Sequence, residues 1–326
     1  MFNITLPTCN RPAMLRTALT SITTQTRVDL VSHIVVSENG GNRASEDVCR
    51  EFSALPIEYI YRDPQVSTLE HMNILVTDHL QDELTVHLHD DDWWAPQTLE
   101  NAARGLARHP DAVCYVAAYY NVAGESAVLT HSGSPLFWFG AGFPDLADFW
   151  ELSPLAVTLA SLIHTPAIFP AMFIRTNVLR EAGNVFGLGN DYDVDRMLAA
   201  RLAQMGTLVF HPFPDVLRRN HPTQDSLRFS HERAARLMSR TTDWILAGSR
   251  ISKEELLAAF NDRLKRCPDH ARMKVGEYLF CSWCIPHLKT TLGPIEIDKS
   301  WPNPRNTGGS PGLLPRIIRE ITGKKR

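Results

Sequence analysis

The sequence predicts an α/β fold whose first part is a doubly wound sheet flanked by helices. Over about the first 110 residues, apolar runs of strand type alternate four times with amphipathic helical patterns, which is typical of βαβ units. The chain has 326 residues, of which 44% are hydrophobic and 21% charged, so it is long enough to bury a full core. Right-handed crossovers place the carboxyl ends of parallel strands at one edge of the sheet, where α/β proteins usually bind their ligands.

The first three units consist of short strands that end in polar loops. Pro12 opens a helix, because the apolar positions after it recur at helical spacing. Ser67 and Glu70 form a capping box, which starts a further helix. We expect strands at 2–6, 30–37 and 57–61, and helices from Pro12 onward, at about 43–54 and from Ser67 to about Leu80. The loops that follow these strands should therefore converge at one edge.

The fourth strand, at 84–88, leads to the acidic triplet Asp90-Asp91-Asp92. Two tryptophans follow the triplet, and Pro96 opens a helix that ends near residue 108. Three adjacent carboxylates repel one another, so a fold keeps them where water or a cation relieves the repulsion. The sequence therefore predicts either an acidic turn in solvent or a site for a hard divalent ion such as Mg²⁺ or Mn²⁺, which prefers carboxylate and phosphate oxygens.

The second half of the chain begins irregularly and ends in helices. Residues 132–166 are rich in Gly, Pro and aromatic residues; core packing is the favoured role of these aromatics over sugar binding. Asn190 fits an N-cap and places Asp191 in the first turn of a helix. We expect strands at 112–119, 169–175, 208–210 and 216–218, and helices at 177–182, from 190 onward and at about 230–247, 252–265 and 270–292. These patterns divide the chain into an α/β domain, residues 1–225, and a C-terminal helical extension with a tail, residues 226–326.

The chain lacks the signatures of several other classes of protein. No GxGxxG follows the first strand and no GxxxxGK[ST] loop occurs, which argues against a dinucleotide dehydrogenase and a P-loop enzyme. The formal net charge of −3 gives no indication of a nucleic-acid partner. No apolar stretch reaches the roughly 18 residues of a membrane span, and Met1–Thr5 lacks the basic region of a signal peptide. Six scattered cysteines indicate reduced thiols, so we expect a cytoplasmic protein.

Two features near the C-terminus leave alternatives open. The spacing of Cys267, Cys281, Cys284 and His287 is compatible with a zinc site, but the segment carries an apolar helical pattern, which favours buried thiols. The tail closes with an apolar stretch and the cations Lys324-Lys325-Arg326. Such an end can contact the anionic inner face of a membrane, although a docked or frayed terminus is the favoured interpretation.

Several segments, in this order, resemble the family-2 glycosyltransferases with the GT-A fold over residues 1–225. They are Leu6–Pro12, Val35–Gly40, the acidic triplet with Trp94 and Pro96, Phe173–Arg175 with Leu179 and Gly183, Asn190–Asp193, and Arg219–His221. The resemblance implies the GT-A mixed sheet flanked by helices. It also implies transfer of a sugar, with inversion, from a nucleotide-diphosphate sugar to an acceptor hydroxyl.

The resemblance further implies roles for individual residues. Asp191 resembles the general base on the acceptor hydroxyl, and Asp91 resembles the carboxylate that holds Mn²⁺ or Mg²⁺ on the donor diphosphate. Asp92 and His221 are the further expected metal ligands. The expected contacts of the donor nucleotide are Pro7, Thr8, Asn10, Arg11, Glu38, Asn39, Arg62 and Asp90.

The chain departs from the pattern of the family in three of its motifs. His89 stands where the DXD-type motif often begins with an acid, Asn190 stands where an acid commonly precedes the base, and Glu38-Asn39 replaces two aspartates. The last departure leaves the nucleotide base open, with a UDP-sugar the preferred donor and guanine an alternative. The expected acceptor is a glycan or a lipid-linked saccharide in polysaccharide biosynthesis, and a homodimer is left open.

Two other functions compete with this interpretation. A nucleotidyltransferase shares the sheet, the metal and the nucleotide pocket, but its glycine-rich basic loop is missing after the first strand. A protein that binds sugar nucleotides or glycans without catalysis is the other alternative. The presence of both Asp91 and Asp191 argues against it.

Overall fold

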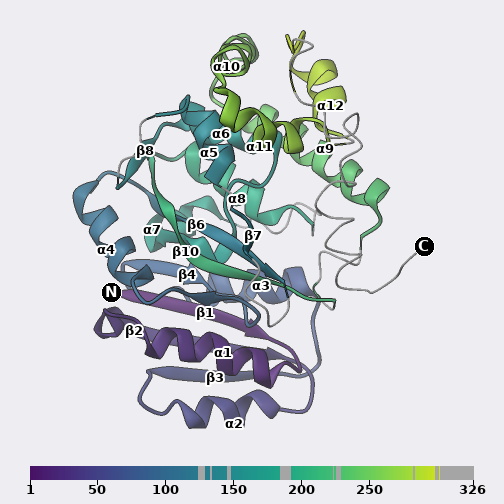
Figure 1. The fold of residues 1–326 in the computed structure, drawn as a ribbon. Helices are drawn as coiled ribbons and strands as arrows, with labels where there is room; N and C mark the ends of the chain where they lie inside the picture. Colours follow the sequence, from purple (N-terminus) through teal and green to yellow (C-terminus); the bar gives the residue numbers. More distant parts are fainter. Residues whose placement is uncertain are drawn as a thin grey trace.

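The structure is a computed structural model in which a mixed β-sheet carries helices on both faces (Figure 1). It describes residues 1–123, 129–132, 134–144, 148–183, 192–222, 224, 229–281, 283–297 and 301. The strands are β1 Phe2–Thr8, β2 Val31–Asn39, β3 Ile57–Arg62, β4 Leu84–His87, β5 Trp93–Trp94, β6 Cys114–Ala123, β7 Leu129–Ser132, β8 Trp150–Leu152, β9 Met172–Arg175 and β10 Leu208–Asn220.

The described helices fall into an early set between the strands and a late set after β10. The early set is α1 Pro12–Thr23, α2 Ala44–Glu51, α3 Thr68–Asp78, α4 Thr98–Arg108, α5 Ser134–Ala141, α6 Pro154–Ile163, α7 Thr176–Ala182 and α8 Val194–Ala203. The late set is α9 His231–Gly248, α10 Lys253–Arg266, α11 Asp269–Leu279 and α12 Cys284–Thr291. Two short 3₁₀ turns, Val28–Leu30 and Phe169–Ala171, complete the elements.

The sheet is parallel in its first half and mixed beyond it. Its strand order is β3-β2-β1-β4-β9-β6-β10-β5, with β7 paired to β6 and β8 paired to β10. Strands β3, β2, β1 and β4 are parallel, whereas β9 is antiparallel to both of its neighbours. The ends of β1 and β2 therefore lie at the same edge as the acidic triplet that follows β4.

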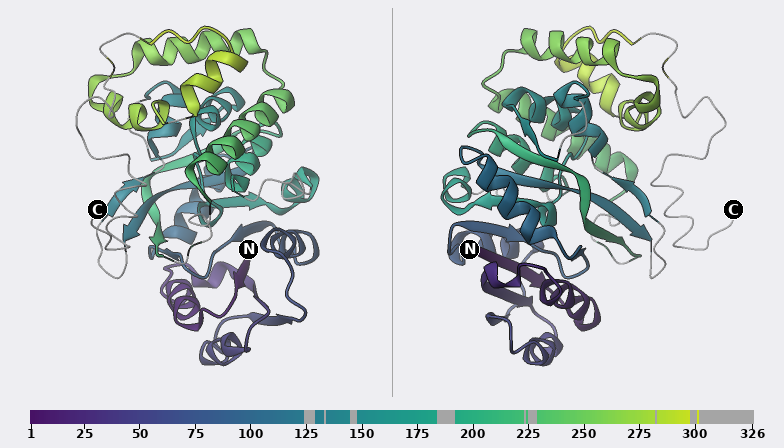
Figure 2. Two further views of the ribbon diagram at one scale, coloured as in Figure 1. Left: turned by 90° about the vertical axis from the view of Figure 1, so that its right-hand side faces the viewer. Right: turned by 60° about the vertical axis from the view of Figure 1, so that its left-hand side comes forward.

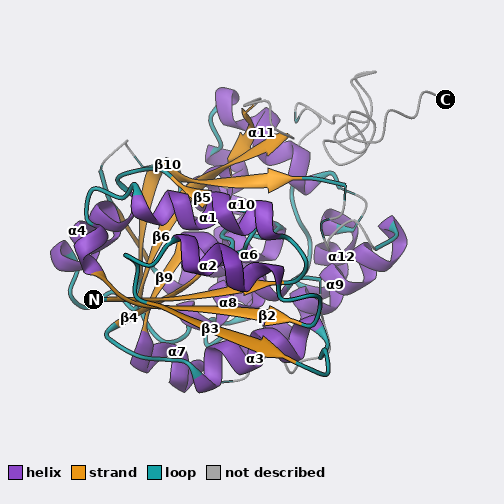
Figure 3. Cartoon of the chain, turned by 90° about the horizontal axis from the view of Figure 1, so that it is seen from below, coloured by secondary structure: helices purple, strands orange, loops and turns teal. Residues whose placement is uncertain are grey.

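Each face of the sheet has its own apolar core. Buried residues of α1, α2 and α4 pack on one face, which faces the viewer in Figure 3 at α1 and α2. Residues of α3, α5, α6, α7 and α8 build the core of the other face. Because helices cover both faces of the sheet, the ends of its strands are held in place. The edge of the sheet is therefore a rigid support for a site.

The late helices pack on the helices of the second core. Helix α9 contacts α6 and α8, α10 contacts α6, α11 contacts α5, and α12 contacts α6 and α9. In Figures 1 and 2 they lie at the opposite end of the molecule from β1, β2 and β3. Their buried residues belong to the same apolar cluster as α6 and α8. The division of the chain at residue 225 stays a prediction.

Several predicted element boundaries were wrong. Pro96 does not open a helix: Trp93–Trp94 pairs with β10, Ala95 N–H donates to Asp215 O, and α4 begins only at Thr98 after a turn. Residues 208–220 form one strand with two register shifts, not two strands.

Two further boundaries differ from the prediction. The predicted strand at 169–175 begins as a 3₁₀ turn, since Pro170 offers no N–H to a strand ladder. The helix predicted at 270–292 breaks between α11 and α12. The stretch 132–166 contains α5, β8 and α6 among its described residues, and its aromatics Phe137 and Phe139 are buried in the core, as predicted.

None of the described helices is both long and apolar enough to cross a membrane. The basic tail that was considered for membrane contact lies outside the described residues.

Candidate active site

A cavity of about 710 Å³ opens at the carboxyl edge of the parallel strands. That volume suits a nucleotide-sized ligand. The lining comes from the end of β1 and the loop after it, the end of β2, the start of α3 and the loop before it, the acidic triplet, and the segments around β9, α8 and the end of β10. The lining residues are Pro7, Thr8, Cys9, Arg11, Asn39, Gln65, Val66, Ser67, Thr68, Leu69, His71, Met72, His89, Asp90, Asp91, Asp92, Ile168, Phe169, Tyr192, Val194, Asp195, Arg218, Arg219, Gln224 and Phe229.

Asp90 is held by the loop that follows β1. Thr8 Oγ1 donates to Asp90 Oδ2 at 2.8 Å, and Arg11 Nη1 lies 3.3 Å from the other carboxylate oxygen. Burial and the neighbouring charge of Asp91 raise the pKa of Asp90 to about 6, against the opposing effects of Arg11 and Thr8. The β1 loop therefore fixes the first carboxylate of the triplet.

Asp91 is held by groups from two other segments of the chain. His221 Nε2 lies 2.8 Å from Asp91 Oδ2, and Arg11 Nη1 lies 3.5 Å from the same oxygen. Burial acts to raise the pKa of Asp91, but the hydrogen bond from His221 and the charges of His89 and Arg11 outweigh it and lower the pKa to about 2. Asp91 is thus the member of the triplet that stays ionised most readily.

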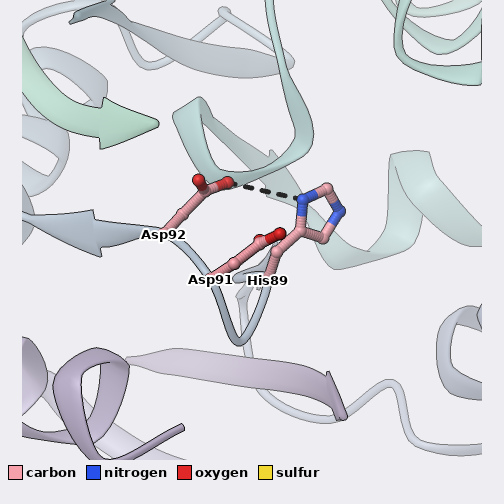
Figure 4. A group of neighbouring side chains, drawn as sticks. All are labelled: His89, Asp91 and Asp92. Carbon is pink, nitrogen blue, oxygen red and sulfur yellow. Dashed lines mark ion pairs between the residues drawn. The ribbon is translucent and has the colours of Figure 1, made fainter. Parts of the chain in front are cut away.

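Asp92 completes a compact cluster with His89 (Figure 4). Its Oδ2 lies 3.4 Å from His89 Nδ1, and its Oδ1 accepts a hydrogen bond from Arg219 N–H at 2.9 Å. One ligand atom each of His89, Asp91 and Asp92 lies within 4.8 Å of the others. Among the described residues, these three side chains form the group of His, Cys, Asp or Glu residues that could hold a metal ion. Two carboxylates suit Mg²⁺ or Mn²⁺, and an imidazole beside them favours the transition ion.

The cluster differs from the predicted metal set in one member. His89 takes part in it, although the sequence marked this position only as a departure from an acidic motif. The predicted ligand His221 contacts the cluster through Asp91 instead. Burial opposes protonation of His89, but its bond to Asp92 and the charges of Asp92 and Asp91 raise its pKa to about 9.

Two arginines at the end of β10 bring positive charge to the same cavity. The guanidinium of Arg219 lies 4.9 Å from the ring centroid of Trp93, and Arg218 Nη1 donates to Asn121 Oδ1 at 3.4 Å. Arg219 Nε is buried without a hydrogen-bond partner among the described groups. Neither arginine was among the predicted site residues. The signal in the sequence that could have identified them is their position near His221 at the end of a predicted strand.

An aromatic wall and a further carboxylate were also missed. Phe169 and Tyr192 line the cavity, and the Tyr192 and Phe229 rings lie 4.9 Å apart. Phe169 N–H donates to Asp195 Oδ1 at 2.7 Å, and burial raises the pKa of Asp195. Because these residues come from three separate segments, no local motif links them.

The predicted donor contacts fall into two groups in the structure. Pro7, Thr8, Arg11, Asn39 and Asp90 line the cavity. Asn39 also positions the loop before α3, because its amide donates to Val66 O at 2.9 Å and accepts from Val66 N–H at 3.0 Å. These five residues are placed where a donor can reach them, and their roles stay predictions.

The other predicted donor contacts lie outside the lining of the cavity. Asn10 Oδ1 accepts from Asn42 N–H at 3.3 Å. Buried Glu38 accepts from the Tyr59 hydroxyl at 2.6 Å, and Arg62 Nε donates to Ser37 Oγ at 3.1 Å. The predicted base, Asp191, lies outside the described residues.

The alternative zinc site is not assembled. His287 Nε2 lies 2.9 Å from Asp243 Oδ1, and Cys267 and Cys284 are buried. Within the described parts of the chain, these cysteines and His287 do not form a group of metal ligands. Cys267 and Cys284 agree with the favoured interpretation of buried thiols, whereas Cys281 is half-buried.

A mixed sheet with an acidic triplet inside a nucleotide-sized cavity at its carboxyl edge is the arrangement expected of an α/β enzyme that acts on a nucleotide-linked substrate. Comparison with protein families agrees: residues 4–158 match the model described as "Glycosyl transferase family 2". The match covers a little under half of the chain, so this part resembles the family, and the matched domain supports a glycosyltransferase. No curated protein matches it in sequence.

Solved structures of similar fold support the fold assignment. One is S. aureus TarS 1-349 in complex with UDP-GlcNAc, with a TM-score of 0.54 and 13% identity over 92% of this chain and 98% of that one. Another is the mannosyltransferase PcManGT from Pyrobaculum calidifontis in complex with GDP-Man and Mn²⁺. Its TM-score is 0.53 at 15% identity, covering 99% of this chain and 81% of that one. The predicted GT-A fold is therefore confirmed.

Proposed function

We propose that the protein transfers a sugar from a nucleoside-diphosphate sugar to an acceptor hydroxyl, with inversion and with a divalent metal ion. The observation that carries this proposal is the cluster of His89, Asp91 and Asp92 on the wall of a nucleotide-sized cavity. The preferred donor is a UDP-sugar, and the proposed acceptor is a glycan or lipid-linked saccharide in polysaccharide biosynthesis. Of the similar structures, TarS was solved with UDP-GlcNAc and PcManGT with GDP-Man and Mn²⁺.

The acidic cluster is the proposed metal site. Asp91 and Asp92 would hold Mn²⁺ or Mg²⁺, with His89 or His221 as the nitrogen ligand. When bound, the ion supplies electrostatic stabilisation of the negative charge that develops on the departing nucleoside diphosphate.

Other residues of the chain act on the donor and the acceptor directly. Arg11, Arg218 and Arg219 place positive charge around the cavity, where a diphosphate needs it. Arg219 Nε is a buried donor available to a ligand oxygen. Asp191 is the proposed general base, which removes the proton of the acceptor hydroxyl as that oxygen attacks the anomeric carbon. Direct displacement inverts the configuration at this carbon.

A donor panel tests the proposal. UDP-sugars and GDP-sugars are added with Mn²⁺, with Mg²⁺ or with EDTA, and the thermal shift and the released nucleoside diphosphate are measured. We expect one donor to stabilise the protein only when metal is present, because ligands that bind the native state raise its stability, by about 2.7 kcal/mol at 100-fold excess over Kd. Asp91→Asn should abolish the metal-dependent shift. Asp191→Asn should keep donor binding and lower turnover by about 10²-fold or more.

One control variant and two contrary outcomes belong to this test of the proposed transferase. Asp111→Asn changes an exposed carboxylate outside the cavity lining and should leave both readouts unchanged. Release of pyrophosphate would indicate a nucleotidyltransferase. Donor binding without hydrolysis or transfer would indicate a binding protein.

A further inference from the structure

A pair of cysteines lies at the start of α12, away from the cavity. Cys281 and Cys284 form a C-x-x-C pair in which Cys281 is half-buried and Cys284 is fully buried. The thiol of Cys284 interacts with the Cys281 sulfur. The N–H groups of Trp283 and Cys284 also donate to that sulfur.

This environment favours the thiolate of Cys281. The hydrogen bond from Cys284, the two backbone N–H groups and the charge of Arg196 lower the pKa of Cys281 to about 7, although burial opposes the shift. Burial and the bond to Cys281 raise the pKa of Cys284 well above its usual range. An accessible thiolate beside a buried thiol is the arrangement of a nucleophilic and a resolving cysteine.

The pair is also coupled to the helix that borders the cavity. The guanidinium of Arg196 on α8 lies 4.9 Å from the ring centroid of Trp283, between the two cysteines. Cys284 Sγ lies 4.0 Å from Leu162 O, and Arg196 Nη2 donates to the same carbonyl at 3.3 Å. Arg196 in turn holds Asp193 at the start of α8, next to the cavity residues Tyr192 and Val194.

We propose that Cys281 and Cys284 form a redox-active dithiol that closes to an intrachain disulfide, and that this bond lowers activity by disturbing the anchoring of α8. The oxidant is a low-molecular-weight disulfide such as glutathione disulfide. The Cys281 thiolate attacks it, forms a mixed disulfide and releases one glutathione thiolate. The deprotonated Cys284 then attacks the Cys281 sulfur and releases the second glutathione. Two cysteine thiols are thereby oxidised and one glutathione disulfide is reduced to two glutathiones.

The disulfide itself is tested by mass mapping of the full chain. The reduced protein is equilibrated with glutathione disulfide, quenched with acid, treated with N-ethylmaleimide and digested with trypsin. Both cysteines fall in one peptide, since no Lys or Arg lies between Lys274 and Lys289. We expect this peptide to be two hydrogens lighter and unlabelled, and to take two labels after reduction. In Cys284→Ser the Cys281 peptide should instead carry glutathione.

Two outcomes would overturn the proposal that Cys281 and Cys284 form a disulfide. One is labelling of both cysteines at every glutathione ratio; the other is glutathione on Cys281 of the unaltered chain without closure. Half-buried Cys9 serves as an internal control, because it has no second cysteine at this spacing and should never close a loop.

The effect on activity rests on the proposed function and is measured separately. Oxidation should lower kcat by about fivefold with little change in donor KM. Cys281→Ser should keep the activity of the reduced protein and should not respond to oxidant. Equal kcat of the reduced and the oxidised chain would overturn the coupling. The mass map needs no turnover, so its failure is distinguishable from failure of the proposed function.

Discussion

Arg196 is a fully buried cation whose donors are matched by the surrounding chain. Its side chain has 0% exposure, and Nη1 lies 2.9 Å from Asp193 Oδ2, itself 1% exposed. Further donors reach the carbonyls of Ser161, Leu162 and Met238 and the hydroxyl of Thr242. One side chain thus joins α6, α8 and α9 beside the cavity. A buried ion pair adds little net stability against an apolar substitute, yet removing one partner is costly.

We therefore expect Arg196→Met to lower the free energy of unfolding by about 3–5 kcal/mol, because it leaves the Asp193 carboxylate buried without its cation. Urea denaturation followed by circular dichroism measures the loss. The double variant Arg196→Met with Asp193→Asn should lose less than the two single variants added together.

The matched control is the exposed pair Arg27 and Asp29, which solvent screens. Arg27→Met should cause no measurable change in unfolding. Equal losses for the two arginine variants would show that burial does not set the cost.

At the residue scale, the sequence placed the acidic triplet at the edge of the sheet, where it lines the cavity, but it did not show the orientation of the neighbouring side chains. The triplet is local in the chain, so the spacing alone placed it at a strand end. Glu38 and Asn39 illustrate the limit. Successive residues of a strand face opposite sides, so Asn39 lines the cavity while Glu38 packs against Tyr59. The sequence does not show which of the two faces the ligand edge.

At the scale of elements, the contact between α5 and α6 depends on one glycine. A Cβ at Gly140 would lie 2.0 Å from Ala156 O, a backbone atom that can move only with its helix. Gly140→Ala should therefore push α5 away from α6 and lower the free energy of unfolding by about 1–3 kcal/mol. The shift of the urea midpoint at unchanged slope is the measurement.

Gly248, the last residue of α9, provides the control for this substitution. A Cβ there meets nothing within 4 Å, and the residue needs no left-handed backbone. Gly248→Ala should be neutral or stabilise by up to about 1 kcal/mol, since alanine favours helix. If both variants lost the same stability, helix packing at Gly140 would not be the cause.

Elements set by local signals were the ones the sequence predicted well. Ser67 caps α3 as the capping box predicts, with its Oγ accepting from Glu70 N–H. The errors arise where distant pairing decides. Ala95 N–H donates to Asp215 O on β10, which is far along the chain. The pairing of Trp93–Trp94 with β10 overrides the local helix propensity at Pro96, and α4 begins only at Thr98.

At the scale of the molecule, the late helices share a core with the sheet-bearing part. Phe260 on α10 is fully buried, and its ring lies 5.1 Å from the ring of Phe139 on α5. Both belong to the apolar cluster that also contains α6 and α8. If the late helices had a core of their own, we would expect a polar interface between α10 and α5. An aromatic pair lies between these helices instead.

We therefore expect the whole chain to unfold in one transition, with the late helices losing structure together with the sheet. Phe260→Ala should lower the free energy of unfolding by about 3–5 kcal/mol, because it opens a cavity between α10 and α5. Far-ultraviolet circular dichroism and tryptophan fluorescence should report the same, lower midpoint. An early transition seen by circular dichroism alone, with donor-induced stabilisation retained above it, would contradict this expectation. It would show that α9–α12 fold as a unit separate from the site. A single shifted midpoint means that the cavity depends on helices far from it in the sequence, because their packing holds α6 and α8 in place.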